Sequence, residues 1–287
     1  MAGEIFDRPP SDMRQIATVV YYELYKYVRS ARMVGIFALA VLIVALILIV
    51  PPALGQEYPR DPAYFAQRFI LWANVLIVVG ATLFAGDSLA SEFQGRTGYL
   101  MFPNPVKRYV FFTGKFLASL LTMVFVVAVF YVAVSLLTIW HSQRFSDLTY
   151  DSFGLSVLYI VAAISVGYLI SSIMKGATGA LVFTFAVLFL IFPIIDGVLS
   201  FAGAKPAFSL TFSAQAISFI MQSPYPTDQL LTFPVGGRFL GGDAGGDSVE
   251  IWNYFPEVST AALVMIIYAV VCVAAALIIF QRREMAA

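Results

Sequence analysis

Six long apolar runs constrain the fold of this chain more than any other feature. Each holds about 20 residues, the length that an α-helix needs to cross the hydrocarbon core of a bilayer. No Asp, Glu, Lys or Arg interrupts these runs, which cover residues 33–52, 69–86, 116–140, 153–174, 176–195 and 258–280. Because backbone N–H and C=O groups inside lipid must be satisfied within their own segment, the runs predict helices. We therefore expect an all-α, polytopic membrane protein with six transmembrane helices.

The composition supports a membrane protein. Hydrophobic residues make up 60% of the chain and charged residues 12%, against about 25% charged residues in ordinary soluble domains. The formal net charge is zero, so no basic surface suited to nucleic acid is expected. The single cysteine, Cys272, lies within an apolar run, which excludes an intrachain disulfide and indicates a small buried hydrophobic side chain.

The distribution of Lys and Arg predicts the orientation, since positive residues favour cytoplasmic loops. Of the 17 Lys and Arg residues, twelve fall on the side of both termini and five on the other side. Both termini are therefore expected in the cytoplasm, in a multi-pass protein of the cell membrane. The predicted parts are a cytoplasmic N-terminal arm (1–32), a transmembrane domain (33–280) with a cytoplasmic loop (87–115) and an extracellular loop (196–257), and a cytoplasmic tail (281–287).

A charge-free stretch in the extracellular loop, residues 206–227, is long enough to form a further span. Its Gln, Ser and Thr residues make insertion costlier than for the six runs, and a crossing would place Arg282 and Arg283 outside. We interpret the stretch as a re-entrant or interfacial helix between spans five and six. The glycine-rich residues 241–247 indicate a flexible loop rather than a calcium-binding repeat.

The N-terminal arm carries a helical stripe. Apolar residues recur there every three or four positions, which is the period of one helix face. The stripe consists of Met13, Ile16, Val20, Leu24, Tyr27 and Ala31. Cations beside it favour an amphipathic helix that lies along the inner interface of the lipid bilayer. This helix either anchors the first span alone or also contacts a cytoplasmic partner.

The cytoplasmic loop 87–115 is a polar island between two apolar runs. Asp87 and Glu92 begin it, glycine and proline residues follow, and Lys107 and Arg108 precede the third span. Lys115 lies about two turns further on, close enough to reach back to the interface. The two carboxylates, the turn and the basic pair form a compact surface on which another protein can dock. The alternative is an ordinary connecting loop with positive-inside charges.

This island resembles the cytoplasmic loop of the permease subunits of type-2 ABC transporters. Those subunits show a glutamate, a nearby Gly and Thr, then Pro-Val-x-Arg, and a Gly-Lys pair that opens the third span. The matching residues here are Glu92, Gly95, Thr97, Pro105, Val106, Arg108, Gly114 and Lys115. Residues 22–30, Tyr-Glu-Leu-Tyr-Lys-Tyr-Val-Arg-Ser, also resemble the start of that family.

The resemblance implies the permease subunit of an exporter that is driven by a separate ATPase. In that family the loop between spans two and three carries a coupling helix, which sits in a groove of the ATPase beside the N-terminal amphipathic helix. The coupling residues that the resemblance implies are Asp87, Glu92, Phe93, Gly95, Arg96, Thr97, Pro105, Lys107, Arg108 and Lys115. It also implies two ATPase subunits and a second permease, either another copy of this chain or a paralogue.

The chain lacks the phosphate-binding sequence of an ATPase. The pattern Gly-x-x-x-x-Gly-Lys-Ser/Thr does not occur, because Gly114 and Lys115 are followed by Phe116, and Tyr109 stands where the first glycine would be. We therefore expect no catalytic residue, no metal site and no cofactor in this chain. ATP and Mg²⁺ are expected to bind the partner ATPase.

The transport path is weakly marked. An ionisable residue inside a span is a functional candidate by default, and the six runs contain none, which argues against proton-coupled or sodium-coupled transport. The candidate path residues are Asn74 in the second span and Phe189, Phe192 and Asp196 in or at the end of the fifth. The alternatives, which we favour for Asn74 and Asp196, are helix packing and capping or solvation of the outer helix end, respectively.

Two other classes of function stay open. An ATP-independent channel or carrier would conduct its substrate without a partner. A lipid-modifying membrane enzyme would use Asp87 and Glu92 as acid and base or as metal ligands, but His141 is predicted on the opposite face of the membrane and two carboxylates do not complete a metal site.

Overall fold

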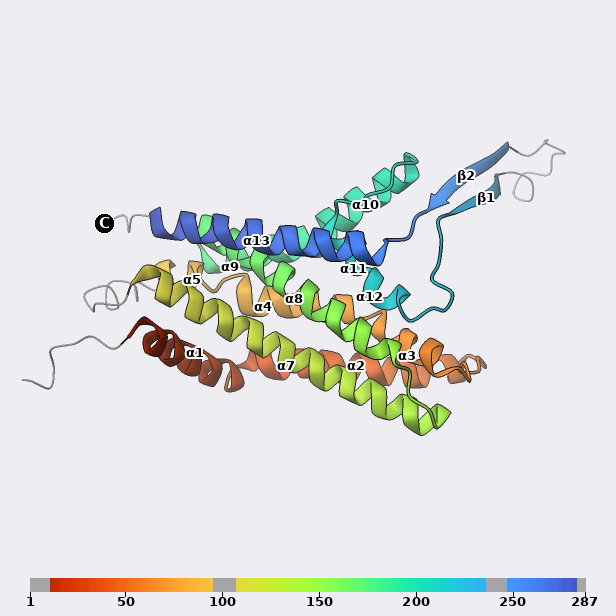
Figure 1. Cartoon of the computed structure of the whole chain (residues 1–287), viewed down its shortest axis with the longest axis horizontal. Helices are drawn as coiled ribbons and strands as arrows, with labels where there is room; N and C mark the ends of the chain where they lie inside the picture. The colour runs from red at the N-terminus through yellow and green to blue at the C-terminus, as the bar shows by residue number, and fades with distance from the viewer. Residues whose placement is uncertain (1–10, 95–106, 236–246, 283–287) are drawn as a thin grey trace, which may run out of the picture.

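The computed structural model describes residues 11–94, 107–235 and 247–282. Six helical segments in this part are long and apolar enough to cross a membrane, namely Ala31–Ala53, Pro62–Glu92, Arg108–Ser142, Leu148–Ile173, Ala177–Phe201 and Val258–Arg282. They form one elongated bundle (Figure 1). The prediction of an all-α, polytopic membrane protein with six membrane-crossing helices is thereby confirmed.

The N-terminal arm is helical, as predicted. Helix α1 (Asp12–Val28) precedes α2 (Ala31–Ala53) and lies beside the first turns of α7 (Arg108–Ser142). Four residues of the predicted stripe are buried or half-buried against the bundle: Ile16, Val20, Leu24 and Tyr27. The first and last stripe residues, Met13 and Ala31, are exposed. We call this part of the molecule the α1 end; the described end of the last span lies there too (Figure 1).

The second span is broken into three helices. They are α3 (Pro62–Ile70), α4 (Ala73–Ala85) and α5 (Ala90–Gln94). Helix α3 begins seven residues before the predicted span, because the Asp61 carboxylate caps it by accepting hydrogen bonds from the N–H groups of Ala63 and Tyr64 at 2.8 and 3.1 Å. The turns between the three helices place α5 as a separate short helix at the α1 end (Figure 1).

Helix α7 and helix α8 (Leu148–Ile173) form the centre of the bundle together with α4. Helix α7 starts eight residues before the predicted third span, so the last part of the predicted loop is helical. Helix α8 approaches α4 closely at Gly167, where an added Cβ atom would lie 2.9 Å from Cβ of Ala85. The largest fully buried side chains of the described residues include Tyr159, Tyr168, Phe69 and Phe84.

The fifth span combines two kinds of helix. It consists of α9 (Ala177–Ala186), the π-helical turn η1 (Val187–Ile191) and α10 (Phe192–Phe201). It ends six residues later than predicted, and α10 leans away from the other helices (Figure 1). The sixth span is α13 (Val258–Arg282), which packs along α8.

The charge-free stretch 206–227 does not form a helix of membrane-crossing length. It contains two short helices, α11 (Leu210–Ala214) and α12 (Ala216–Phe219), which pack against α8 and α13. Side chains of the spans satisfy their backbone: Ser152 Oγ donates to the carbonyl oxygen of Ile217 at 2.6 Å, and Asn74 Nδ2 donates to that of Ala214 at 3.1 Å. Such pairing allows irregular backbone to lie within a helical bundle.

A two-stranded hairpin follows these short helices, and the sequence did not predict it. Strand β1 (Gln229–Val235) pairs antiparallel with β2 (Asp247–Asn253), with Gln229 opposite Asn253. The hairpin projects beyond the bundle at the end opposite α1, which we call the hairpin end (Figure 1). The predicted flexible loop 241–247 lies outside the described residues, except for Asp247.

Candidate functional sites

A group of polar side chains lies at the α1 end, within an otherwise apolar bundle. Its members come from α1, α2, α7, α8 and the α4–α5 region, and each makes a hydrogen bond or ion pair to another of these elements. We call the following ten residues the polar cluster: Glu23, Tyr27, Arg32, Asp87, Ser88, Glu92, Lys115, Ser119, Tyr168 and Ser171.

Lys115 of α7 joins three helices within the polar cluster. Its Nζ atom lies 2.6 Å from Oε1 of Glu23 on α1 and 2.8 Å from Oε1 of Glu92 on α5, and only 1% of its side chain is exposed. Removing an ammonium group from water costs several kcal/mol unless charged partners replace the water. The expectation that Lys115 reaches back to the interface is therefore wrong. Since α7 begins at Arg108, Lys115 lies about two turns inside this helix.

Arg32 at the start of α2 makes a second ion pair in the cluster. Its Nη1 and Nη2 atoms donate to Oδ1 and Oδ2 of Asp87 at 2.8 and 2.5 Å, and Nη1 also donates to the carbonyl oxygen of Leu83 at 2.7 Å. The Asp87 side chain is 8% exposed. A planar guanidinium matches a carboxylate with two parallel hydrogen bonds, so the pair fixes orientation as well as distance.

Four hydroxyl groups of the polar cluster form a hydrogen-bonded chain of their own. Ser119 Oγ lies 3.1 Å from the Tyr27 hydroxyl and 3.0 Å from the Tyr168 hydroxyl, which in turn lies 2.9 Å from Ser88 Oγ. Tyr27 and Ser119 both donate to the carbonyl oxygen of Phe84. Burial raises the pKa of Tyr27, so its hydroxyl keeps its proton and can donate. The chain of hydroxyls thus links α1, α4, α7 and α8.

Helix α5 is attached to α8 by its first backbone groups. The N–H groups of Leu89 and Ala90 donate to Ser171 Oγ at 2.9 and 3.0 Å. The first N–H groups of a helix have no partner within the helix, so an external oxygen stabilises its start. Together with the Glu92 ion pair, this contact holds α5 at two points.

Exposed polar contacts lie at the rim of the same end. Asp12 accepts hydrogen bonds from Lys107, at 2.8 Å, and from the Tyr109 hydroxyl. The hydrogen bond from Lys107, and then that from Tyr109, lower the pKa of Asp12, and the same bond with Asp12 raises the pKa of Lys107. Arg108 donates to the carbonyl oxygen of Gln281 at 2.8 Å, which connects the start of α7 to the end of α13.

Gly114 allows α1 to lie directly on α7. A Cβ atom at this position would lie 2.6 Å from Cγ1 and 2.7 Å from Cβ of Val19, distances at which atoms overlap. Any larger residue would push the two helices apart, unless Val19 moved. The glycine of the Gly-Lys pair therefore has a packing role, and the lysine next to it has an ionic one.

The structure brings most of the predicted coupling residues that it describes to the α1 end. Asp87, Glu92 and Lys115 belong to the polar cluster, whereas Lys107 and Arg108 make the rim contacts. Phe93 lies in α5. The remaining four predicted residues, Gly95, Arg96, Thr97 and Pro105, lie outside the described residues.

Other members of the cluster were missed from the sequence. Glu23 and Arg32 lie in the predicted N-terminal arm, and Ser119 and Tyr168 lie inside predicted apolar runs. Their spacing in the chain gives no sign of contact, because the bonds join residues 35 to 92 positions apart. The signal that could have indicated Ser119 and Tyr168 is the hydroxyl group itself, because it lies in the half of a span that is nearest to a charged loop.

A larger cavity, which we call the Asp196 pocket, lies towards the hairpin end. Its volume is about 540 Å³, and three of the four predicted path residues line it: Asn74, Phe189 and Asp196. The fourth, Phe192, does not line it but packs edge-to-face on Tyr268, with ring centroids 5.9 Å apart. The interpretation of Asp196 as a cap or a solvated end is wrong, because α10 continues to Phe201 and the Asp196 side chain is buried.

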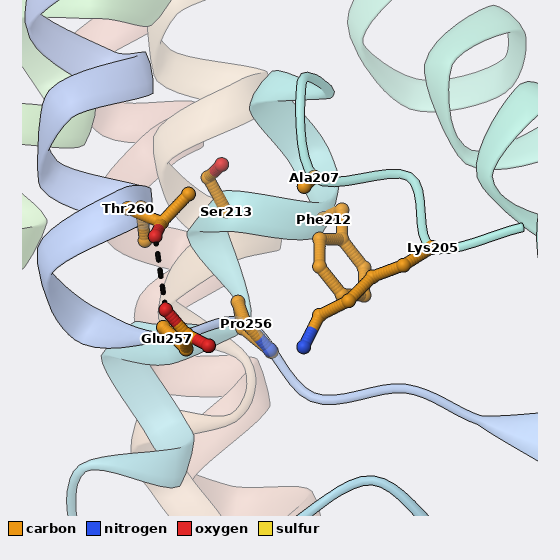
Figure 2. A pocket seen from close by; sticks show the side chains of 8 residues that line it. Lys205, Ala207, Phe212, Ser213, Pro256, Glu257 and Thr260 are labelled. Carbon is orange, nitrogen blue, oxygen red and sulfur yellow. Dashed lines mark hydrogen bonds between the residues drawn. The ribbon is translucent and has the colours of Figure 1, made fainter.

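A smaller cavity of about 110 Å³ lies near the start of α13. Figure 2 shows that Lys205 and Glu257 lie on its rim and that Thr260 donates to Glu257, at 3.2 Å. The Lys205 ammonium is paired with Asp228, with Nζ 2.9 Å from Oδ2. Both charged groups, Lys205 and Glu257, therefore already have partners in the fold. We interpret this cavity as part of the packing between α13 and the extended segment after α10.

These features define the class of the protein before any relative is considered. Six membrane-crossing helices, a docked N-terminal helix and a short helix held by an ion pair at the end of the second span define a multi-pass membrane protein. The family model described as ABC-2 family transporter protein matches residues 17–285, so the chain belongs to this family and is an ABC transporter permease. Membership implies an ABC ATPase partner in general. No curated protein matches the chain.

Proposed function

We propose that this chain is the permease subunit of an ABC exporter and that ATP hydrolysis in a separate ATPase drives substrate movement through it. Family membership supports the permease role. The polar cluster is the observation that carries the coupling. Helix α5, next to the loop that is expected to meet the ATPase, is held to α7 by the Glu92–Lys115 ion pair and to α8 by Ser171, and Lys115 is in turn paired with Glu23 on α1.

The cluster offers a physical route for the coupling. An ATPase can shift the equilibrium between two states of the permease only through contacts that differ between those states. A displacement of α5 changes the distance from Glu92 to Lys115, and Lys115 is also paired with Glu23 on α1. In a buried site such a change is energetically large, because the charges have little water to replace a lost partner.

The α1 end faces the cytoplasm in this proposal, with both termini on that side. The support is the positive-inside distribution of Lys and Arg. In a Cys272→Ala background, a cysteine at the exposed position Met13 should react with a membrane-impermeant maleimide only after the cell is opened. A cysteine at Leu54, which is 70% exposed between α2 and α3, should react in intact cells. The reverse pattern would overturn the orientation.

The proposed assembly contains two permease chains and two ATPase subunits. The second permease is either another copy of this chain or a paralogue, and the ATPases bind the ATP and Mg²⁺. Co-expression with candidate ATPases, followed by purification and measurement of mass and subunit ratio, tests this assembly. Failure of the chain to associate with any ABC ATPase would contradict the proposed function.

The coupling itself is tested by ATP-dependent transport into sealed lipid vesicles that contain the permease and its ATPase. Glu92→Gln keeps the size of the side chain but removes its charge, so the variant should still assemble while losing most of the ATP-dependent transport. Lys26→Gln is the control for an exposed ion pair. Like Lys115, Lys26 pairs with Glu23, at 3.3 Å, but the Lys26 side chain is 60% exposed. Equal transport by both variants, or transport by the purified chain without ATPase, would count against coupling through the cluster.

A further inference from the structure

We propose that the Asp196 pocket binds the protonated amine of an amphipathic cationic substrate. This inference rests on the proposed function as a permease and adds a substrate class to it. The pocket lies in the half of the bundle opposite the polar cluster, and its volume of about 540 Å³ falls in the range of about 300–1,000 Å³ found for small-molecule sites.

Two side chains that line the pocket each have an oxygen atom without a hydrogen-bond partner among the described residues. These atoms are Oδ1 of Asp196 and Oδ1 of Asn74, and both are buried. The Asp196 side chain is 7% exposed, and its other oxygen, Oδ2, accepts a hydrogen bond from Thr211 at 2.5 Å. Buried polar atoms are nearly always paired, and leaving one unpaired costs about 1–3 kcal/mol. Two acceptors without a donor, on side chains of one pocket, therefore indicate where a ligand with hydrogen-bond donors would bind.

The chemistry of these two atoms defines what the ligand must supply. Asn74 Nδ2 already donates to the carbonyl oxygen of Ala214, which fixes the amide so that Oδ1 is the free atom. Both free atoms accept hydrogen bonds, so the ligand must carry donors. Asp196 is the charged residue in the described lining, and no Lys, Arg or His there neutralises it. A cationic donor, such as an ammonium group, satisfies both requirements.

The remaining lining predicts the rest of the ligand. Aromatic side chains from α8, η1, α11, β2 and the segment after β2 line the same pocket: Tyr159, Phe189, Phe212, Trp252 and Tyr254. Their faces attract a cation and their area favours an apolar or aromatic body. A hydrophilic cation would lose its hydration in the pocket and would bury little apolar surface in return. A neutral apolar molecule would leave Oδ1 of Asp196 and Oδ1 of Asn74 without a hydrogen-bond donor. An amphipathic amine fits both parts of the pocket.

The test uses a fluorescent amine and its neutral analogue. Dansylcadaverine carries a protonated primary amine on a five-carbon chain, and its N-acetyl derivative has the same dansyl group without the charge. Both are titrated into the full chain in nanodiscs, and binding is followed by energy transfer from tryptophan to dansyl. Trp252→Phe should lower the transferred emission more than Trp140→Phe, since Trp252 lines the pocket and Trp140 does not.

Asp196→Asn should weaken dansylcadaverine binding by about tenfold or more, the effect of losing a hydrogen bond to a charged group. It should leave binding of the acetylated probe unchanged. Asp151→Asn is the matched control, because it removes the same charge from an exposed position at the start of α8. Asn74→Leu, which removes the second acceptor, should also weaken binding of the amine and keeps the test decisive if Asp196→Asn does not fold.

Equal affinities of the amine and its acetylated form for the unmodified chain would overturn the inference, as would an unchanged affinity in both pocket variants. Binding by the isolated chain needs no ATPase, so the two proposals fail separately. Loss of ATPase association with binding intact would contradict only the proposed function. An active permease–ATPase complex that does not discriminate the two probes would contradict only the substrate class.

Discussion

Lys115 and Glu92 meet in the interior of the α1 end, with Nζ of the lysine 2.8 Å from Oε1 of the glutamate. Glu92 belongs to a helix of five residues, α5, which is too short to be stable by itself. The ion pair, together with the Ser171 hydrogen bonds, therefore determines where α5 lies. The position of the proposed coupling helix depends on a side chain in the third span.

Replacing Lys115 by Met should destabilise the fold strongly. The variant leaves the carboxylates of Glu23 and Glu92 without the ammonium that they share, and breaking a buried ion pair costs about 3–5 kcal/mol. The buried Cys272 provides the measurement, since a thiol-reactive fluorophore reports its exposure during thermal unfolding. Lys26→Met removes an exposed partner of Glu23 and should cost about 0–1 kcal/mol. Equal melting temperatures for the two variants would refute the role of Lys115.

The Arg32 and Asp87 pair should show a strong energetic coupling. A double-mutant cycle with Arg32→Lys and Asp87→Asn should give a coupling energy of about 1–3 kcal/mol in the same unfolding assay, because lysine cannot make both parallel hydrogen bonds. Additive effects of the two substitutions would mean that the two side chains act independently.

A side chain at Gly114 should separate α1 from α7. Gly114→Ala is expected to destabilise the chain by about 1–3 kcal/mol, as overpacking does elsewhere, because its Cβ atom would overlap Val19. Adding Val19→Ala to this variant should restore much of the lost stability, because it removes Cγ1 of Val19, the nearer of the two atoms that the new Cβ atom overlaps. Gly154→Ala is the control: nothing lies within 4 Å of a Cβ atom there, and removing a glycine from a helix is neutral or stabilising. A destabilised Gly154→Ala variant, or no rescue by Val19→Ala, would contradict this packing.

The rim contact between Asp12 and Lys107 should depend on pH. The hydrogen bond from Lys107 lowers the pKa of Asp12 below its ordinary value of 3.8, so the contribution of Asp12 is complete above that value and is lost as the pH falls through its lowered pKa. The pKa of Lys107 is raised above 10.5, so its contribution is complete below 10.5 and is lost as the pH rises through the raised value.

A spin label at a Met13→Cys position, in a Cys272→Ala background, measures this dependence. Its mobility should be constant between about pH 4 and pH 10 and should increase below that window, as α1 loosens at its first turn. In Asp12→Asn the acid transition should disappear. An acid transition that persists in this variant would assign the effect to another group.

The sequence predicted the spans well because each is a local property. A charge-free run of sufficient length is visible in the chain itself, and the bilayer leaves helix as the available structure. The boundaries were less accurate where a charge is paired at a distance. Lys115 set the start of the predicted third span at residue 116, yet it lies inside α7, since Glu23 and Glu92 from other helices compensate its charge.

The sites were predictable only in part. Asp87, Glu92 and Lys115 were grouped because they share one loop in the sequence, and the structure does place them at one end. The partners Glu23 and Tyr168 are remote in the chain, and periodicity cannot show which span faces which. The β-hairpin was missed because Pro234 interrupts its first strand and Gly-rich residues follow, a pattern that local rules assign to a loop.

The π turn η1 determines which way Asp196 faces. Leu188 and Asp196 are both buried although eight positions separate them; at 3.6 residues per turn, such residues point about 80° apart on a continuous α-helix. A π turn holds one extra residue and takes up most of that angle, so both side chains share one face. The fifth span is thus an α-helix with a single-residue insertion, which the π turn accommodates. Deleting a residue within 187–191 would keep Asp196 facing the pocket, whereas a deletion between 192 and 195 would rotate its carboxylate away from the pocket.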